Sequence, residues 1–187
     1  RTTGFVDWLF NVYDRYVSVF DPKSCLPYMA IRDVSEGPTY TDYNKVTFYQ
    51  QENTLQSQKS GMKTFNKPLY DIISAMYYLR KNAFHSLKQD QDLKVDTYFC
   101  DEPYTLFIRY VGKQKLRTKF GVINCLKFHP VVETGRVFDT EDDLIFWISD
   151  DKNYVPVRIQ MNIVLGSFRA DLIEYSGLNY SLKTTSK

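Results

Sequence analysis

Apolar and polar residues alternate along most of this chain with the two-residue period that is typical of β-strands. The clearest run is 155–165, where Val155, Val157, Ile159, Met161, Ile163 and Leu165 share one face and most residues of the other face are polar. Comparable runs occupy 10–20, 26–34, 40–50, 54–59, 105–113, 115–128, 144–149 and 168–175. Segments such as Asp21-Pro22-Lys23-Ser24 supply turns between them. The pattern predicts a mainly β, antiparallel fold.

The period changes after Pro68, which suits the first turn of a helix. Apolar residues then recur at steps of three and four, which predicts a helix over 69–83 with a stripe of Leu69, Ile72, Met76 and Leu79. The polar stretch 85–92 is a second short helix or a loop. We therefore expect one or two helices near 69–90, lying across a curved antiparallel sheet or plugging a partly open barrel. The polar tail 178–187 is expected to fray.

Two acidic clusters border the strand 144–149: Glu141-Asp142-Asp143 before it and Asp150-Asp151 after it. A hydrolase could use Asp142 or Asp143 with Asp150 or Asp151. Along a strand, however, Asp143 and Asp150 would be roughly 23 Å apart at ~3.3 Å per residue, whereas glycosidases need roughly 5–9.5 Å. We favour a hairpin turn at 150–153, because Asp and Asn supply its chemistry. A cation bound by Asp150, Asp151 and Asn153 is a further alternative.

Composition fits one soluble domain over 1–187, with 43% apolar, 25% charged and 16% aromatic residues. A net charge of +2 gives no general argument for nucleic acid. No apolar run approaches the roughly 20 residues of a membrane span. The chain starts at Arg1 without a signal peptide, so we expect a mature or trimmed product. Of the three cysteines, Cys100 and Cys125 could form a bridge, but three free thiols are the favoured interpretation.

Catalytic and cofactor motifs are missing from the sequence. It holds two histidines, His85 and His129, without metal-ligand spacing, and eight glycines, too few for a phosphate-binding loop. Cys125 and His129 would lie roughly 13 Å apart along a strand, at ~3.3 Å per residue. We therefore expect no metal, no cofactor and no enzymatic activity.

Two groups of residues are candidates for binding. The first is aromatic and would line a sugar- or lipid-binding cavity, unless it is plain core: Tyr40, Tyr43, Phe48, Tyr77 and Tyr78. The second is a basic strip on one strand face: Lys113, Lys115, Arg117 and Lys119. This strip would face an anion or a partner, unless it is only the solvated outer face of a hairpin.

The order of several segments resembles the DUF3108 family of exported envelope proteins of unknown function, found in Gram-negative and Bacteroides-like bacteria. The most specific parts are the helix ending at Leu79-Arg80 and the pattern Trp147-Ile148-Ser149-Asp150-Asp151 followed by Pro156-Val157 and Gly166. The resemblance implies a periplasmic or outer-envelope location and a lipoprotein-carrier-like half-barrel or a lipocalin-like barrel. Family members usually begin with further strands, which this chain is expected to lack. The family offers no catalytic residues to transfer.

These observations leave three hypotheses for function. The first is a non-catalytic envelope protein that binds a lipid, glycan or peptide in the concave face of its sheet. The second is a structural or interaction module that docks an envelope partner through a sheet edge or the basic strip. The third, a carboxylate-dependent hydrolase, is the least favoured.

Overall fold

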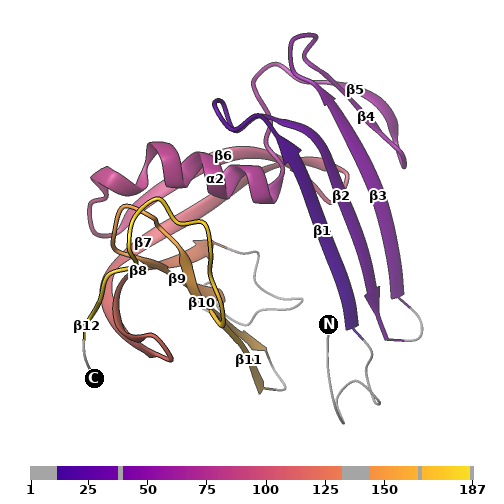
Figure 1. Cartoon of the computed structure of the whole chain (residues 1–187). Coiled ribbons are helices and arrows are strands. Elements are labelled where there is room, and N and C mark those ends of the chain that lie inside the picture. Colours follow the sequence, from indigo (N-terminus) through magenta and orange to yellow (C-terminus); the bar gives the residue numbers. More distant parts are fainter. Residues whose placement is uncertain (1–11, 38–39, 132–143, 164–165, 186–187) are drawn as a thin grey trace. The chain divides into compact units, whose positions relative to one another are not determined.

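The computed structural model describes residues 12–37, 40–131, 144–163 and 166–185. Over these residues the chain is mainly β, with two antiparallel sheets and one α-helix (Figure 1). The predicted curved antiparallel fold with a helix near 69–90 is confirmed, and neither sheet closes into a barrel within the described residues. Two compact units comprise Arg1–Lys81 with Val95–Thr105, and Asn82–Lys94 with Leu106–Lys187. That the chain acts as a single domain stays a prediction.

The first unit contains a five-stranded sheet whose strands follow chain order. They are β1 (Val12–Phe20), β2 (Pro27–Glu36), β3 (Tyr40–Tyr49), β4 (Thr54–Ser57) and β5 (Gly61–Thr64). Each strand pairs antiparallel with the next. The sequence predicts that Gly61 ends the fourth strand, whereas Gly61, at a φ of +79°, begins β5. A four-residue strand is too short to show a period of its own.

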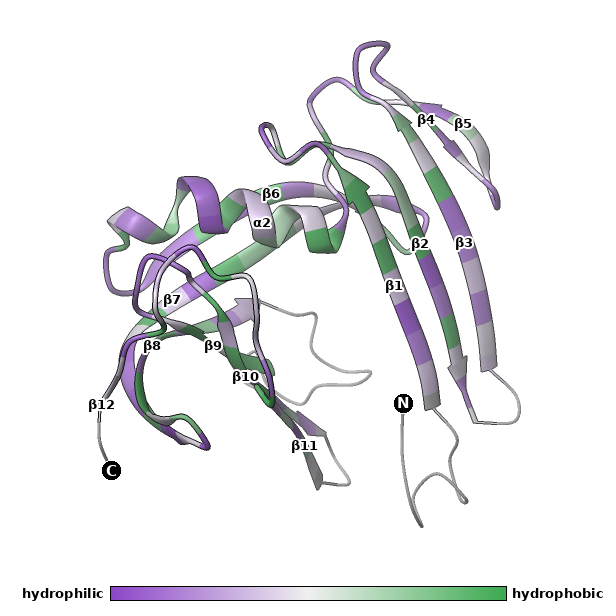
Figure 2. Ribbon diagram, viewed as in Figure 1, coloured by the Kyte–Doolittle hydropathy of each residue, from purple (hydrophilic) through white to green (hydrophobic). Residues whose placement is uncertain are grey.

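Alternation along the strands gives this sheet two different faces (Figure 2). On β3, Asn44, Val46 and Phe48 are buried, while Tyr43 and Tyr49 are exposed on the other face. The buried face, called the inner face below, carries a core cluster of Val46, Phe48, Leu55, Leu69 and Tyr98. This cluster anchors the sheet to the segment before the helix and to the strand that ends at Phe99.

Helix α2 (Ile72–Asn82) begins at Ile72, so the prediction that it starts at Leu69 with Pro68 in its first turn is wrong. Asp71 is the N-cap: its Oδ1 accepts hydrogen bonds from the N–H groups of Ile73 at 2.9 Å and Ser74 at 3.1 Å. The Ser74 hydroxyl accepts from the Asp71 N–H at 3.0 Å, which completes a capping box. Tyr70 is still extended, because it forms a β-bridge with Thr97.

The second sheet is formed by the later strands. After the 3₁₀ helix η1 (Phe84–Ser86) come β6 (Gln91–Phe99), β7 (Glu102–Thr118), β8 (Gly121–Val131), β9 (Leu144–Ser149), β10 (Pro156–Ile163), β11 (Gly166–Asp171) and β12 (Thr184–Thr185). The order is β11-β10-β9-β8-β7-β6, and β12 pairs with β8. β6 and β7 each contribute residues to both units.

The β7–β8 hairpin differs from the predicted strands. The sequence predicts strands over 105–113 and 115–128, with Phe120, Val122, Leu126 and Phe128 on one face, whereas β7 continues to Thr118 and β8 begins at Gly121. Leu126 and Phe128 are buried as predicted, but Phe120 and Val122 are only partly buried, and Ile123 and Cys125 are buried instead. The pairing of β7 with β8 also shifts between Tyr110 and Gly112, as at a β-bulge. The predicted face therefore holds only for the part of β8 beyond Cys125.

The predicted hairpin between β9 and β10 is confirmed by their antiparallel pairing. Its turn is built as the sequence indicates. The Oδ1 of Asp151 accepts hydrogen bonds from the Ser149 hydroxyl at 3.0 Å and from the Asn153 N–H at 2.9 Å. The Ser149 hydroxyl also accepts from the Val155 N–H at 2.8 Å. The Asp151 carboxylate, the Ser149 hydroxyl and the two backbone N–H groups are therefore all hydrogen-bonded within the turn.

The C-terminal segment is docked on the second unit, so the prediction that it frays is wrong for residues 178–185. The Asn153 amide bonds both backbone groups of Tyr180, at 2.9 Å to the carbonyl and 3.2 Å from the N–H. Leu182 is 9% exposed and joins a core cluster with Leu116, Ile123, Cys125, Trp147, Val155 and Val157. The Lys183 N–H donates to Asp151 at 3.1 Å, and β12 follows. We call residues 174–185 the C-terminal strap.

All three cysteines are free, as the favoured interpretation predicts. Cys25 and Cys125 are buried, whereas Cys100 is exposed. Burial raises the pKa of the Cys125 thiol to about 12, so it is unreactive while the fold is closed. None of the helices in the described part of the chain has both the length and the apolar character needed to cross a bilayer.

Candidate functional site

Polar residues interrupt the apolar row on the inner face of the first unit's sheet. Asp42 and Asn44 precede Val46 on β3 at two-residue steps, so all three point to that face. They border a cleft with about 50 Å³ of free volume, whose polar lining includes Arg32, Asp42, Asn44, Lys59, Asp71 and Asp101. Ordinary small-molecule pockets hold roughly 300–1,000 Å³. The cleft therefore fits one small group of a ligand and not a lipid chain.

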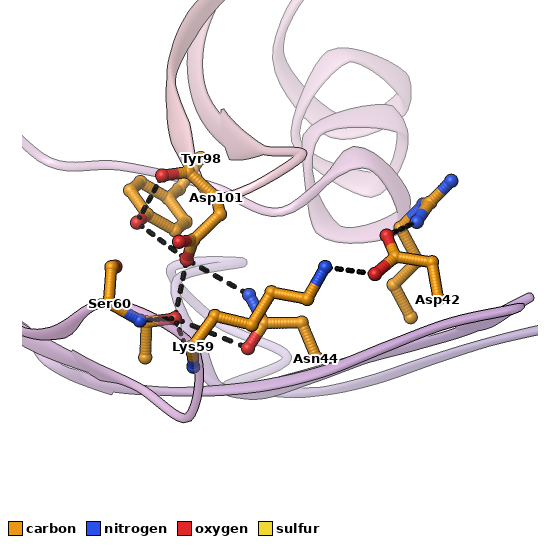
Figure 3. A network of polar contacts seen from close by, with 8 residues as sticks. Asp42, Asn44, Lys59, Ser60, Tyr98 and Asp101 are labelled. Atoms are coloured by element: carbon orange, nitrogen blue, oxygen red, sulfur yellow. Dashed lines mark hydrogen bonds and ion pairs between the residues drawn. The ribbon is translucent and has the colours of Figure 1, made fainter.

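Asp101 is the centre of a hydrogen-bond network in this cleft (Figure 3). Its Oδ1 accepts from the Asn44 amide at 3.0 Å, from the Tyr98 hydroxyl at 3.0 Å and from the Ser57 hydroxyl. The Tyr98 hydroxyl also donates to the Asp101 carbonyl at 2.7 Å. Burial disfavours the carboxylate, but hydrogen bonds from Ser57, Ser60, Tyr98 and Asn44 outweigh it and lower the pKa of Asp101. Asp101 is therefore ionised at neutral pH.

The β6–β7 turn presents Asp101 to this network. Cys100 and Asp101 have φ values of +49° and +69°. Positive φ at both central residues is what a type I′ hairpin turn requires. Aspartate adopts this left-handed region more readily than most residues, and cysteine does not share that preference. The turn is therefore strained at Cys100 and is held in place by the contacts of Asp101.

Asp42 forms the second charged centre of the cleft. Its two carboxylate oxygens accept hydrogen bonds from Lys59 and from the Arg32 guanidinium. Arg32 also interacts with the hydroxyl groups of Tyr16 on β1 and Tyr40 on β3. Burial alone would lower the pKa of Arg32, but these tyrosines raise it above its usual value. The Nε of Arg32 is buried and has no hydrogen-bond partner among the described residues.

The carboxylates of the cleft are all engaged by donors. Asp42 is ion-paired, Asp101 accepts hydrogen bonds from several side chains, and Asp71 caps α2 and accepts from the Ser18 hydroxyl at 2.5 Å. A general base needs an accessible lone pair within reach of the substrate. This arrangement is suited to orienting a polar group rather than to abstracting a proton. The described residues contain no group of three or more His, Cys, Asp or Glu that could hold a metal ion.

The predicted aromatic residues of β3 are divided between two environments. Tyr40 lies on the inner face and is 45% exposed; it does not line the cleft itself but interacts with Arg32, which does. Phe48 is on the same face but is buried in the core cluster. Tyr43 is on the opposite face of β3 and 46% exposed. The three side chains therefore do not line one cavity.

The two predicted tyrosines of α2 pack locally. Tyr77 contacts Phe20 with ring centroids 4.9 Å apart, and Tyr78 contacts Tyr70 at 4.8 Å. Neither lines the cleft. Tyr16 does line the cleft, and this residue is 44% exposed. The structure thus pairs Tyr40 with a tyrosine that the sequence pattern did not single out.

A family model described as "Protein of unknown function (DUF3108)" matches residues 1–173. The chain belongs to the DUF3108 family. No curated protein and no solved structure matches it. The DUF3108 match contains the cleft and the strands β1 to β11, and it ends just before the C-terminal strap.

The basic strip of this DUF3108 chain lies at the far end of the β7–β8 hairpin, in the second unit. Its four side chains, Lys113, Lys115, Arg117 and Lys119, are exposed. Lys113 pairs with Asp150 at 2.7 Å. No ion pair joins the other three to any residue that the structure describes. The strip is therefore a largely unneutralised surface rather than a part of the cleft.

The acidic hairpin of the DUF3108 chain has a structural role in the residues described. Asp150 pairs with Lys113, and Asp151 and Asn153 hold the C-terminal strap. Asp142 and Asp143, the other members of the hypothetical hydrolase pair, lie outside the described residues. Asp151 and Asn153, two of the three residues of the hypothetical cation site, are hydrogen-bonded to protein groups, and these bonds explain the structure of the turn.

Sequence reasoning missed the residues that form the cleft network, above all Asp101, Asn44 and Ser57. One signal was available: Asp42 and Asn44 fall in phase with Val46 and Phe48, so the two-residue period puts polar groups on a core face. A buried polar group must find partners. Asp101 and Ser57 come from other strands, and no local pattern indicates that they meet.

Proposed function

We propose that this DUF3108 chain is a non-catalytic binding protein of the cell envelope, which holds a glycan on the inner face of its first sheet. One observation carries the proposal. Two half-exposed tyrosines, Tyr16 and Tyr40, interact through their hydroxyl groups with the Arg32 guanidinium, whose Nε has no partner in the described structure. Ring faces beside fixed charged donors are what a sugar requires, because sugars offer apolar C–H faces and hydroxyl edges.

The dimensions of the cleft favour a glycan over the other ligands that the sequence suggests. A lipid chain needs an apolar cavity, and about 50 Å³ is too little for one. A glycan can place one hydroxyl-bearing edge in the cleft while its ring covers Tyr16 or Tyr40. The engaged carboxylates Asp42 and Asp101 support binding without catalysis.

Tyr40 and Tyr43 lie on opposite faces of β3 and are similarly exposed, so they allow a matched test of ligand binding. Replacing Tyr40 or Tyr16 with alanine is expected to weaken binding of a soluble oligosaccharide about five-fold, since one stacking contact is worth about 1 kcal/mol. Tyr43→Ala is the matched control, because Tyr43 is 46% exposed against 45% for Tyr40. Titration calorimetry with neutral and acidic oligosaccharides measures the effect. Equal losses in the Tyr40 and Tyr43 variants, or binding only to peptides, would refute the glycan site.

The envelope location is supported by the resemblance described above and can be tested through Cys100. This thiol is exposed, whereas Cys25 and Cys125 are buried. In cells carrying the full-length protein, a maleimide that passes the outer but not the inner membrane is expected to label one cysteine. Cys100→Ala should abolish the labelling. Labelling that needs lysis of the inner membrane would place the protein in the cytoplasm and contradict the proposal.

An interaction module that docks an envelope partner is the second candidate. The exposed basic strip favours it, because three of its four charges have no counter-ion in the described residues. The two candidates use different units of the chain, so the variants of one leave the other unchanged.

A further inference from the structure

The end of the β7–β8 hairpin concentrates positive charge in a chain that is otherwise balanced. The whole chain has 24 basic and 22 acidic residues. Residues 111–127 contain five basic side chains and no acidic one: Lys113, Lys115, Arg117, Lys119 and Lys127. Positive charge is therefore concentrated at this end of the hairpin, although the net charge of the whole chain is close to zero.

The geometry of the strands spreads these charges evenly over one face. Lys113, Lys115 and Arg117 follow each other at two-residue steps of about 6.8 Å and are all exposed. The register places uncharged residues opposite them on β8: Leu126, Asn124 and Val122. Only the Asp150 carboxylate reaches this face among the described residues, at Lys113. The remaining charges are open to an anionic partner.

Apolar groups lie at the same end of the hairpin. The Lys119 ammonium lies 5.2 Å from the ring centroid of Phe120, in the turn between the two strands. The ring of Tyr175, from the C-terminal strap, meets Phe120 at 5.0 Å. Tyr175 is 40% exposed, and Ile173, two residues before it, is 72% exposed. The basic strip thus ends beside the rings of Phe120 and Tyr175, and the exposed Ile173 is close to Tyr175 in the chain; we call these three residues the tip.

We propose that this tip docks the chain on the surface of a bilayer that contains anionic lipids. The lipid phosphates would pair with the strip, and each basic residue near such a surface adds a favourable increment. The long Lys and Arg stems let the charges reach the head groups while Phe120, Tyr175 and Ile173 enter the interface. This role goes beyond the glycan site, which lies in the other unit.

The apolar residues of the tip favour an anionic bilayer over a nucleic acid or an acidic polysaccharide as the partner. A single-stranded nucleic acid is held by aromatic rings placed along the charged groove, where bases stack on them. Here the strip itself has no aromatic residue, and the rings are at its end. An acidic polysaccharide would need the charges but would gain nothing from the exposed Ile173. A bilayer interface uses both features.

The test is sedimentation of the full chain with vesicles, either of phosphatidylcholine alone or with about 30% phosphatidylglycerol. We expect binding to the anionic vesicles only, and weaker binding when salt shortens the Debye length from about 10 Å to about 4 Å. Changing the four strip residues to serine should lower the partition coefficient about five-fold for each charge removed. The control removes the same charge from four other exposed lysines: Lys23, Lys45, Lys88 and Lys94.

The other outcomes separate the alternatives. A variant that exchanges Lys and Arg within the strip keeps the charge and should keep binding, because lipid phosphates pair with either side chain. Ile173→Ser should weaken binding to vesicles but leave binding to heparin unchanged. An equal loss in the control variant would show a general charge effect and overturn the proposal. Binding to heparin or DNA without binding to vesicles would also overturn it, in favour of a polysaccharide or nucleic-acid surface.

Discussion

Replacing Asp101 with alanine is expected to lower the free energy of unfolding of the first unit by about 2–4 kcal/mol, because the change removes charge-assisted hydrogen bonds. The donors of Asn44, Ser57 and Tyr98 would lose their shared acceptor. Desolvated donors without a partner cost more than the bonds themselves contribute. Urea unfolding followed by circular dichroism measures the loss.

The effect should depend on pH in a defined direction. Because the folded state lowers the pKa of Asp101, its carboxylate contributes stability that is complete above the unfolded value of about 3.9. This contribution is lost as the pH falls through the lower folded value. The difference between the wild type and Asp101→Asn, which keeps the left-handed turn but not the charge, should therefore be largest near neutrality and shrink in acid.

Asp33→Ala is the matched control for this prediction. Asp33 is on β2 of the same sheet, and its carboxylate has no hydrogen bond to another described residue. We expect a change within about 0.5 kcal/mol, as for ordinary surface positions. If Asp101→Ala changed the stability no more than Asp33→Ala does, Asp101 would not be the centre of a network.

The sequence predicted those parts of the fold in which neighbours along the chain decide the structure. Alternation located most strands, and the turn chemistry of Asp151 and Asn153 located the β9–β10 hairpin. Alternation failed at the β7–β8 turn, which divides the predicted strand 115–128, because Lys119 and Phe120 in that turn are not typical turn residues. It also failed at the start of α2, where the tertiary bridge from Tyr70 to Thr97 keeps the chain extended.

The candidate site was harder to predict because it joins residues from distant positions. Asn44 and Asp101 are 57 residues apart, and Ser57 and Asp101 are 44 apart. Residue type alone marks Tyr40 and Phe48 equally as candidates for ligand binding, although Tyr40 is exposed and Phe48 is buried. The basic strip could be predicted from the sequence, because its charged residues recur at two-residue steps along the chain. Its neighbour Tyr175 could not be found that way, because the C-terminal strap brings it to Phe120.

Replacing Leu182 with alanine is expected to destabilise the second unit by about 2–3 kcal/mol, through lost burial and a cavity in the core. Leu182 is 9% exposed and packs with Trp147 and Cys125. Ser181→Ala is the matched control, because Ser181 is the exposed neighbour in the same strap. We expect a change within about 0.5 kcal/mol there.

A second change tests the same strap from the opposite side. A Cβ at Gly121 would lie 2.9 Å from the Thr185 carbonyl oxygen, and its φ of +115° already disfavours other residues. Gly121→Ala should therefore push β12 away from β8. Cys125 reports the opening, since its buried thiol has a pKa of about 12. In a chain without Cys25 and Cys100, both variants should speed thiol labelling of Cys125 about ten-fold or more, as about 1.4 kcal/mol corresponds to a factor of ten. Labelling as slow as in the Ser181 control would mean that the strap does not cover this core.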